Sequence, residues 1–332
     1  MIKRNMLAKT CVLVMSVLAL FAAWPMPGQA ASHSKKPSHS TESAAESASS
    51  EKSSHKKSSS VSDPFFRIDR DSADAWQKKL SNVRIFTDTV HMSGSAQFSA
   101  GQFHDLAETL REKVPGEQVY VIDLREESHA FLNGIAVSWY GSNNQVNKGM
   151  PLEDVLADEK ARFGALPGQT IQVYKKSSRK KKADGSSSSR KSEAQITVET
   201  VMYEQELAEQ EGFGYLRIPV TDHTFPTPDE VDMFINFVKS IDPNHSHLHF
   251  HCHAGRGRTG IYMMLYDKMR NPGLSDETII ERQVSTGSSN PMKGSEDPDA
   301  AKLMPLLFRY VEENQAAGYP VAWSEWLPAH RM

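Results

Sequence analysis

The chain has 332 residues, of which 39% are hydrophobic and 24% are charged, and its formal net charge is −3 at pH 7. This slight excess of acids argues against a general nucleic-acid-binding protein, because such proteins carry a basic surface. An anionic substrate must therefore be met by a local basic pocket. With the first 30 residues and two low-complexity segments set aside, roughly 250 residues remain, enough for one domain of ordinary to large size.

The N-terminal residues 1–30 are typical of a secretory signal peptide. Basic residues precede an apolar run over 11–24, and small residues follow up to Ala30. This order predicts cleavage after Ala30 and an exported protein, periplasmic or secreted. The apolar run is short for a membrane span, so an uncleaved anchor is the weaker alternative.

Cleavage after Ala30 would remove Cys11 and leave Cys252 as the last cysteine of the chain. No intramolecular disulfide is then possible, although compartments outside the inner membrane favour disulfides. A single thiol in an exported chain therefore calls for a separate explanation, such as a reactive role.

Two low-complexity segments are predicted to lie outside the packed core. Residues 31–62 are rich in Ser, Lys, His and Glu, cannot offset the entropy of ordering, and are predicted to be a disordered tether. Residues 175–193 contain eight Lys or Arg and two acids, and we expect a mobile basic loop that joins two strands. Its charge either contacts an anionic surface weakly or is a solvated insertion without a partner.

Strand and helix patterns alternate along the globular part, predicted over 63–328. Short apolar strands are predicted at 118–124, 214–220 and 247–252. Helices are predicted at 97–114 and after Thr227, Gly255, Ser275 and Pro298. The alternation predicts an α/β fold with a mainly parallel central sheet flanked by helices.

A strand-rich region interrupts this alternation. Residues 134–174 contain "IAVSWYG" and "TIQVYKK" and show few helix signals, and "AQITVETVMY" continues the pattern after the basic loop. We therefore expect a small β subdomain, inserted at about 134–210.

The stretch "HCHAGRGRT" reads as an anion-binding loop between a strand and a helix. Gly255 and Gly257 allow a tight turn in which backbone N–H groups point inward, and such a nest at a helix N-terminus binds a tetrahedral anion. Arg258 can clamp two phosphate oxygens. The same positive field favours the thiolate form of Cys252. The alternative is a buried structural cysteine, the usual role of a lone Cys.

This stretch, extended to "HCHAGRGRTG", resembles the signature loop of the cysteine-dependent phosphatases, the superfamily of protein tyrosine phosphatases. The resemblance implies that Cys252 attacks phosphorus and forms a cysteinyl-phosphate while Arg258 holds the equatorial oxygens. It further implies that Thr259 eases departure of the thiolate and that His251 tunes the thiol. Such covalent catalysis requires no metal and no cofactor.

Asp222, in "VTDHTFPTP", is the candidate acid that protonates the leaving group. It lies thirty residues before Cys252 at the end of a predicted strand, and a parallel sheet brings such strand ends to one edge. A helix start with Thr227 as N-cap, Pro228 and Glu230 fixes the far side of this turn. The superfamily carries its acid on this kind of loop; the alternative is that Asp222 only caps a turn.

One branch of the superfamily is matched more closely. "FRIDR", "VIDLREESHAFLNGIAVSWYG", "IPVTDHTFPTP" and "YPVAWSEWL" resemble the bacterial tyrosine-phosphatase-like inositol polyphosphatases, or cysteine phytases. The resemblance covers most of 64–328 and excludes the tether and the basic insertion. It implies an inositol polyphosphate substrate and a β subdomain beside the active-site pocket.

A ring with many phosphates needs several polar and cationic groups around the reacting phosphate, and His253 would add charge when protonated. The resemblance and this requirement together give the candidate substrate-binding residues: His253, Ala254, Gly255, Arg256, Gly257, His223, Arg67, Lys293, Lys302 and Asp123.

Several alternatives stay open. Each lysine can equally be a solvated surface charge. Arg125 and His129 can line the pocket with Asp123, or Arg125 and Glu126 can form a structural ion pair. Gly260 and basic loop residues are commoner in tyrosine and lipid phosphatases than in phytases, so a protein tyrosine phosphatase or phosphoinositide phosphatase, including a secreted effector, is the alternative function. A non-catalytic polyphosphate-binding module is the third.

Overall fold

The computed structural model describes residues 64–69, 79–176, 180–181, 187–188, 191–293 and 299–331. The predicted signal peptide and the tether lie outside the described residues, as does most of the basic insertion. Among the described residues, no helix combines the length and the apolarity needed to cross a bilayer.

The central sheet has five strands in the order β12-β4-β13-β3-β2. These strands are β12 (Gly214–Arg217), β4 (Gln118–Asp123), β13 (Ser246–His251), β3 (Met92–Ser95) and β2 (Arg84–Phe86). All neighbours are parallel except the edge pair of β2 and β3. The register sets His251 opposite both Asp123 and Ser95, so the carboxyl ends of the central strands meet at one edge.

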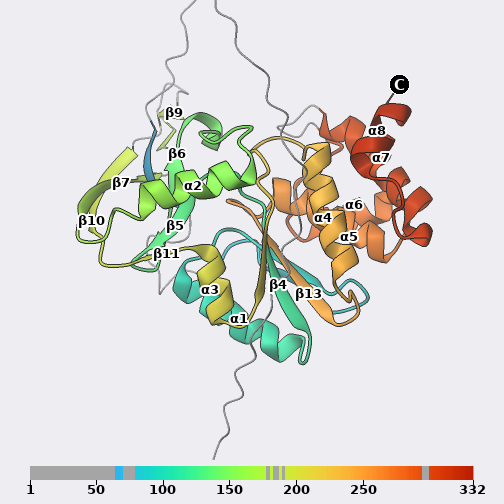
Figure 1. Ribbon diagram of the computed structural model, residues 1–332, viewed down its shortest axis with the longest axis horizontal. Coiled ribbons are helices and arrows are strands. Elements are labelled where there is room, and N and C mark those ends of the chain that lie inside the picture. The colour runs from blue at the N-terminus through green and yellow to red at the C-terminus, as the bar shows by residue number, and fades with distance from the viewer. Residues whose placement is uncertain are drawn as a thin grey trace, which may run out of the picture. The chain divides into compact units, whose positions relative to one another are not determined.

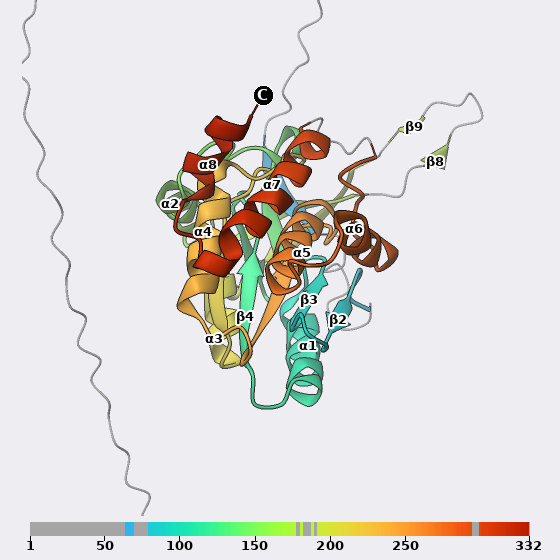
Figure 2. The ribbon, with the colours of Figure 1, turned by 90° about the vertical axis from the view of Figure 1, so that its right-hand side faces the viewer.

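Helices cover both faces of the central sheet, as the α/β prediction requires (Figure 1). One face packs against α4 (Pro228–Ser240), α5 (Gly257–Arg270), α6 (Asp276–Ser285), α7 (Ala300–Asn314) and α8 (Trp323–His330). The other packs against α1 (Ala100–Lys113) and α3 (Glu204–Gln210). In Figure 2, helices α5, α6 and α7 lie in front of the central strands.

A second sheet of six strands, in the order β10-β7-β1-β6-β5-β11, forms the inserted β subdomain. It contains β1 (Phe65–Ile68), β5 (His129–Leu132), β6 (Ile135–Tyr140), β7 (Thr170–Lys176), β10 (Lys191–Thr197) and β11 (Val201–Met202). Strands β7 and β10 pair antiparallel up to Lys176 and Lys191, so the basic insertion connects two paired strands. Within the insertion, β8 (Lys180–Lys181) pairs with β9 (Ser187–Ser188).

The predicted fold is confirmed, with two corrections inside the subdomain. Strands β1 and β5 precede the predicted insertion but join its sheet, β1 beside β6 and β7 and β5 beside β6. Residues 134–174 also contain a helix, α2 (Leu152–Phe163), although the sequence of this region shows few helix signals. Its buried face consists of three side chains, so its apolar periodicity is weak. Its charges were the usable signal, with acids in the first turn and bases in the last.

The helix that follows the acid-bearing turn begins as predicted. The Thr227 side chain accepts from the backbone N–H of Glu230, and the Glu230 side chain accepts from the backbone N–H of Thr227. Pro228 occupies the first helical position. This capping box fixes the C-terminal end of the turn that carries Asp222.

Candidate active site

The cysteine loop lies at the carboxyl edge of the central sheet. Cys252 directly follows β13 and is 3% exposed. Gly255 has a φ of +67°, and a Cβ atom there would lie 2.4 Å from the carbonyl group of Ser95. Only glycine can occupy this position, because both the backbone conformation and the close approach exclude a side chain.

The carbonyl groups of the loop all point outward to donors on other segments. The carbonyls of His253, Ala254, Gly255 and Arg256 accept from Gln97 N (3.3 Å), Asn82 Nδ2 (2.7 Å), Arg84 Nη1 (2.8 Å) and Ser289 N (3.1 Å). In a trans peptide the N–H group points opposite to the carbonyl. The N–H groups of these four peptides therefore face the interior of the loop and form an anion nest.

Arg258 is fixed at the mouth of this nest by contacts with surrounding loops. Its Nη1 donates to the carbonyls of Leu124 (3.1 Å) and Val220 (3.0 Å) and to Glu127 Oε2 (2.8 Å). Its Nη2 donates to Glu127 Oε1 at 3.1 Å. Its Nε is buried without a hydrogen-bond partner. The guanidinium is thus held on one edge and leaves an N–H group available for an oxyanion.

Charges around Arg258 keep the guanidinium and its partner ionised. Burial opposes the charge of Arg258, but the carboxylates of Asp222 and Glu127 hold its pKa well above its ordinary value. Burial likewise opposes the charge of Glu127, yet Arg258 and Arg125 hold its pKa well below its ordinary value. The ion pair of Arg258 and Glu127 therefore favours the charged form of both side chains.

Asp222 lies beside the clamp. Its Oδ1 is 3.1 Å from Nη2 of Arg258, and its side chain is 19% exposed. Asn144 Nδ2 donates to its Oδ2 at 3.0 Å, and Gln145 Nε2 donates to its carbonyl at 2.7 Å. The structure thus brings Asp222, Arg258 and the cysteine loop together at the sheet edge, as the parallel strand order predicts.

Two residues next to Cys252 and Arg258 are buried and do not line an opening. His251 is fully buried, and its Nε2 lies 2.5 Å from Oε1 of Glu204. Thr259 is also fully buried, and its Oγ1 has no hydrogen-bond partner. His251 therefore contacts the interior of the fold, while the Thr259 hydroxyl keeps its hydrogen-bonding capacity at the start of α5.

Arg67 reaches the site from β1 of the subdomain. Its guanidinium lies 3.9 Å from the centre of the Tyr140 ring, its Nη2 lies 3.3 Å from Oδ1 of Asp69, and its Nε is buried without a hydrogen-bond partner. His253 Nε2 also lies 3.3 Å from Oδ1 of Asp69. The cysteine loop and the subdomain therefore share one carboxylate.

Comparisons with known proteins agree with this geometry. The family model for protein-tyrosine-phosphatase-like (PTP-like) phytases, described by inositol hexakisphosphate, matches residues 122–270. The match covers under half of the chain, from the end of β4 to the end of α5, and it includes Asp222 and the cysteine loop. This family falls within the cysteine-dependent phosphatases, so the predicted family is confirmed.

Two solved PTP-like phytase structures show the extent of the likeness. The tandemly repeated PTP-like phytase from Mitsuokella multacida has a TM-score of 0.69 and 31% identity over 80% of this chain and 49% of that chain. A PTP-like phytase from Bdellovibrio bacteriovorus has a TM-score of 0.64 and 27% identity over 81% of this chain and 96% of that chain.

Two further relatives are a phosphatase solved with an inositol phosphate and a bacterial effector protein. The PTP-like myo-inositol phosphatase from Mitsuokella multacida, in complex with myo-inositol-(1,3,4,5)-tetrakisphosphate, is 34% identical and has a TM-score of 0.64 over 79% of this chain and 46% of that chain. Effector protein hopD2 of Pseudomonas syringae pv. tomato is 28% identical over 231 residues, 66% of this chain and 48% of that protein. The chain spans about half the length of these two relatives.

Within the PTP-like phytase frame, three candidate residues have a different setting from the expected one. Asp123 is fully buried and accepts from Tyr215 OH at 2.8 Å, so its carboxylate does not reach a substrate. Arg125 pairs with Asp69 at 3.0 Å and with Glu127 at 2.8 Å rather than with Glu126.

His253 is also unlike the expectation. Burial and the neighbouring charge of Arg67 hold its pKa below the ordinary value, against the pull of Asp69. In this structure the surroundings therefore disfavour the protonated imidazole, and protonation of His253 beside a phosphate stays a prediction.

The remaining charged candidates have exposed side chains. Arg256 is exposed on the cysteine loop, and His223, with a φ of +64°, is exposed next to Asp222. Lys293 is exposed in the segment whose Ser289 N–H donates to the loop. Lys302 is 76% exposed on α7 and pairs with Asp299 at 3.5 Å. The hydrogen bond of Ser289 thus ties the segment of Lys293 to the loop, whereas the ion pair of Lys302 lies at the start of α7.

Sequence reasoning missed several residues that build the site, namely Glu127, Asn144, Asn82 and Arg84. Glu127 lies in the quoted "DLREESH" motif and could have been found as a third acid there. Arg84 holds the loop through its hydrogen bond to the Gly255 carbonyl. Burial lowers the pKa of Arg84 to about 10; the nearby Cys252 opposes this shift, and the charge of Arg256 adds to it. Asn82 and Arg84 come from the edge strand region, which carried no sequence signal.

One buried group offers ligand atoms of the kind that metals bind. Ligand atoms of Asp123, His129 and Glu204 all lie within 4.8 Å of one another. Arg217 Nε lies 3.4 Å from Asp123 Oδ2, and its Nη2 lies 3.3 Å from His129 Nδ1. A guanidinium therefore already supplies the positive charge, and the cluster fits an internal ion-pair network better than a cation site.

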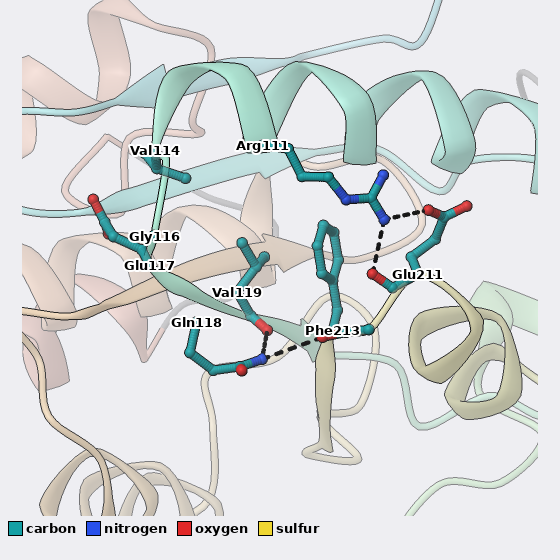
Figure 3. A pocket seen from close by; sticks show the side chains of 9 residues that line it. Arg111, Val114, Gly116, Glu117, Gln118, Val119, Glu211 and Phe213 are labelled. Atoms are coloured by element: carbon teal, nitrogen blue, oxygen red, sulfur yellow. Dashed lines mark hydrogen bonds and ion pairs between the residues drawn. The ribbon is translucent and has the colours of Figure 1, made fainter. Parts of the chain in front are cut away.

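A pocket of about 220 Å³ lies away from the cysteine loop (Figure 3). It is lined by Gln118 at the amino end of β4, by Phe213 and by the ion pair of Arg111 and Glu211. The cysteine loop sits at the carboxyl end of the same sheet, so this pocket takes no part in the site.

Proposed function

We propose that the protein is a phosphomonoester hydrolase that acts on inositol polyphosphates, phytate among them, through a cysteinyl-phosphate intermediate. The observation that carries this proposal is the cysteine loop itself. Four loop carbonyls accept hydrogen bonds from other segments, so the N–H groups of the same peptides face the interior of the loop. Cys252 lies at the start of this loop, and Arg258 follows it at the start of α5. Such a cradle binds a phosphoryl group next to a thiol.

In the first step, Sγ of Cys252 attacks phosphorus and the bond from phosphorus to the ester oxygen breaks. Asp222 donates its proton to the departing alkoxide. Inward N–H groups and Arg258 stabilise the charge on the equatorial oxygens. In the second step, Asp222 takes a proton from water, the water oxygen attacks phosphorus, and the phosphorus–sulfur bond breaks. The hydroxyl of Thr259 then stabilises the departing thiolate.

The substrate class is supported by the family and by the charge around the loop. A related myo-inositol phosphatase was solved with an inositol tetrakisphosphate. Arg67 comes from strand β1 of the subdomain, and Arg256 is an exposed residue of the loop itself. Phosphates that do not react need such outlying cations, whereas a single phosphotyrosine needs an apolar slot.

The alternative function is that of a protein tyrosine or phosphoinositide phosphatase, including a secreted effector, and the likeness to the effector protein hopD2 favours it. Export, periplasmic or secreted, follows from the predicted signal peptide and is part of the proposal. Weak contact of the basic insertion with anionic surfaces stays a prediction, since the side chains concerned lie outside the described residues.

Release of inorganic phosphate from three substrates tests the choice: phytate, a phosphotyrosine peptide and a phosphoinositide in mixed micelles. We expect the highest kcat/KM with phytate. A kcat/KM that is at least tenfold higher for the peptide or the lipid would replace the substrate class and keep the chemistry. Binding of phytate without turnover would favour a non-catalytic module.

A further inference from the structure

Asn144 belongs to the inserted β subdomain, yet its side chain lies among the residues of the clamp and the acid. It ends the 3-10 turn η1 (Ser142–Asn144), in the connection from β6 to α2, and is 3% exposed. Its φ of +62° lies in the left-handed region, which asparagine tolerates better than most residues. The chain thus adopts an uncommon backbone conformation where this side chain enters the site.

The carboxamide of Asn144 makes three hydrogen bonds, each with a different charged residue. Its Nδ2 donates to Oε1 of Glu127 at 2.6 Å and to Oδ2 of Asp222 at 3.0 Å. Its Oδ1 accepts from Nη2 of Arg67 at 3.5 Å. Both amide hydrogens are donated to carboxylates, and the amide oxygen faces a guanidinium. One side chain thus connects the candidate acid Asp222, the Arg258 partner Glu127, and Arg67 of the subdomain.

We propose that Asn144 is a positioning residue that keeps Asp222 beside the anion nest after a phosphoryl group has entered it. This proposal deepens the proposed function and rests on Asp222 being the general acid. In the structure, Oδ1 of Asp222 pairs with Nη2 of Arg258. An entering phosphoryl group competes with this carboxylate for the guanidinium. The hydrogen bond from Asn144 is to the other oxygen, Oδ2, and does not depend on Arg258.

The surrounding contacts support this division of roles. Gln145 donates to the main-chain carbonyl of Asp222, so the same segment holds both the backbone and the side chain of the acid. A neutral amide can donate to Asp222 and Glu127 together without adding a charge that would compete with Arg258. In the loaded enzyme the subdomain, rather than the guanidinium, therefore retains the acid.

Leaving-group dependence tests the proposal, because a 2,4-dinitrophenolate departs without much protonation and a phenolate does not. We expect Asn144→Ala to lower kcat/KM for phenyl phosphate roughly tenfold, as the loss of one hydrogen bond to a charged group predicts. The kcat/KM for 2,4-dinitrophenyl phosphate should change by less than about twofold. Both values report the step up to formation of the cysteinyl-phosphate.

A double mutant gives the second readout. If Asn144 acts through Asp222, then Asn144→Ala combined with Asp222→Ala should be no slower on phenyl phosphate than Asp222→Ala alone. Additive losses, or equal losses on both aryl phosphates with Asn144→Ala, would overturn the proposal. If Asp222→Ala itself slows both substrates equally, the acid assignment fails instead, and the two failures are distinguishable.

Asn147 provides the matched control. It is a buried asparagine in the same connection, and its Nδ2 donates to Ser128 Oγ at 3.0 Å and to Asp158 Oδ2 at 3.1 Å, away from the acid. Asn147→Ala removes a comparable set of hydrogen bonds from the segment. We expect the ratio of the two kcat/KM values to stay at the wild-type value in this variant, and a shift equal to that of Asn144→Ala would assign the effect to general loosening of the segment.

Discussion

Asp222 and Arg258 form an ion pair, 3.1 Å from Oδ1 to Nη2, across the mouth of the cysteine loop. Asp222 comes from the turn between β12 and α4 and Arg258 from the first turn of α5, and the pairing uses the guanidinium that a substrate phosphate needs. Phosphate and the acid are therefore competitors in the resting protein. The competition has a consequence that can be measured without turnover.

Replacing Asp222 should tighten the binding of inorganic phosphate. In Asp222→Ala the guanidinium loses a competing anion, and we expect the inhibition constant for phosphate to fall about fivefold, equivalent to ~1 kcal/mol for two unit charges. Asp229→Ala, which removes an exposed acid from the start of α4, is the control and should leave the constant unchanged. Weaker phosphate binding in Asp222→Ala would show that the pair does not oppose phosphate.

Cys252→Ser should separate binding from chemistry. A hydroxyl is a far weaker nucleophile than a thiolate, so hydrolysis of aryl phosphates should fall at least about a thousandfold. The nest and Arg258 remain, so calorimetry should give a dissociation constant for phosphate within about threefold of the wild-type value. Turnover near the wild-type rate would remove Cys252 from the role of nucleophile.

How far the sequence predicted the site depends on how local each contact is. The cysteine loop was predictable because strand, glycine turn and helix follow one another within ten residues. Asp222 was predictable because parallel strands bring their ends to one edge. Glu127 and Asn144 were not, since their roles depend on how the subdomain lies against the central sheet. The burial of Asp123 was not predicted either, because its hydrogen bond with Tyr215 joins two strands that are far apart in the sequence.

Gly255→Ala should disrupt the loop rather than merely perturb it. The residue has a φ of +67°, and the new methyl group would lie 2.4 Å from the Ser95 carbonyl, so the loop must move. We expect phosphate binding to weaken roughly tenfold or more and the melting temperature to fall. Gly273→Ala, where no atom lies within 4 Å of the added carbon, is the control and should change neither quantity. Unchanged binding in Gly255→Ala would argue that the N–H groups of the loop do not hold the anion.

Arg67→Gln should affect polyphosphates more than monophosphates. Arg67 comes from the subdomain rather than from the cysteine loop, so we expect it to bind a phosphate other than the reacting one. Its buried Nε has no hydrogen-bond partner and can donate to such a phosphate. We expect KM for phytate to rise about tenfold, the effect of one lost charge-assisted contact, with p-nitrophenyl phosphate affected less than about threefold. Equal increases for both substrates would place Arg67 at the reacting phosphate or in the structure alone.

The buried network behind the loop should make stability depend on alkaline pH. Burial and Arg125 oppose the charge of His129, but Asp123 raises its pKa to about 9. A group whose pKa is raised by folding stabilises the protein fully below its unfolded value, about 6.5, and loses this contribution as the pH rises through 9. The contribution is on the order of 3 kcal/mol.

Unfolding by urea between pH 6.5 and 9.5 measures this term, with Cys252→Ser in every protein to remove the thiol from the comparison. The free energy of unfolding should fall with rising pH in the parent, and His129→Gln should reduce the slope while lowering stability at pH 6.5. His245→Gln, at a side chain that is 78% exposed, should keep the slope of the parent. If His129→Gln leaves the slope unchanged, the imidazole is neutral in the folded protein and the network is held by Arg217 and Arg125 alone.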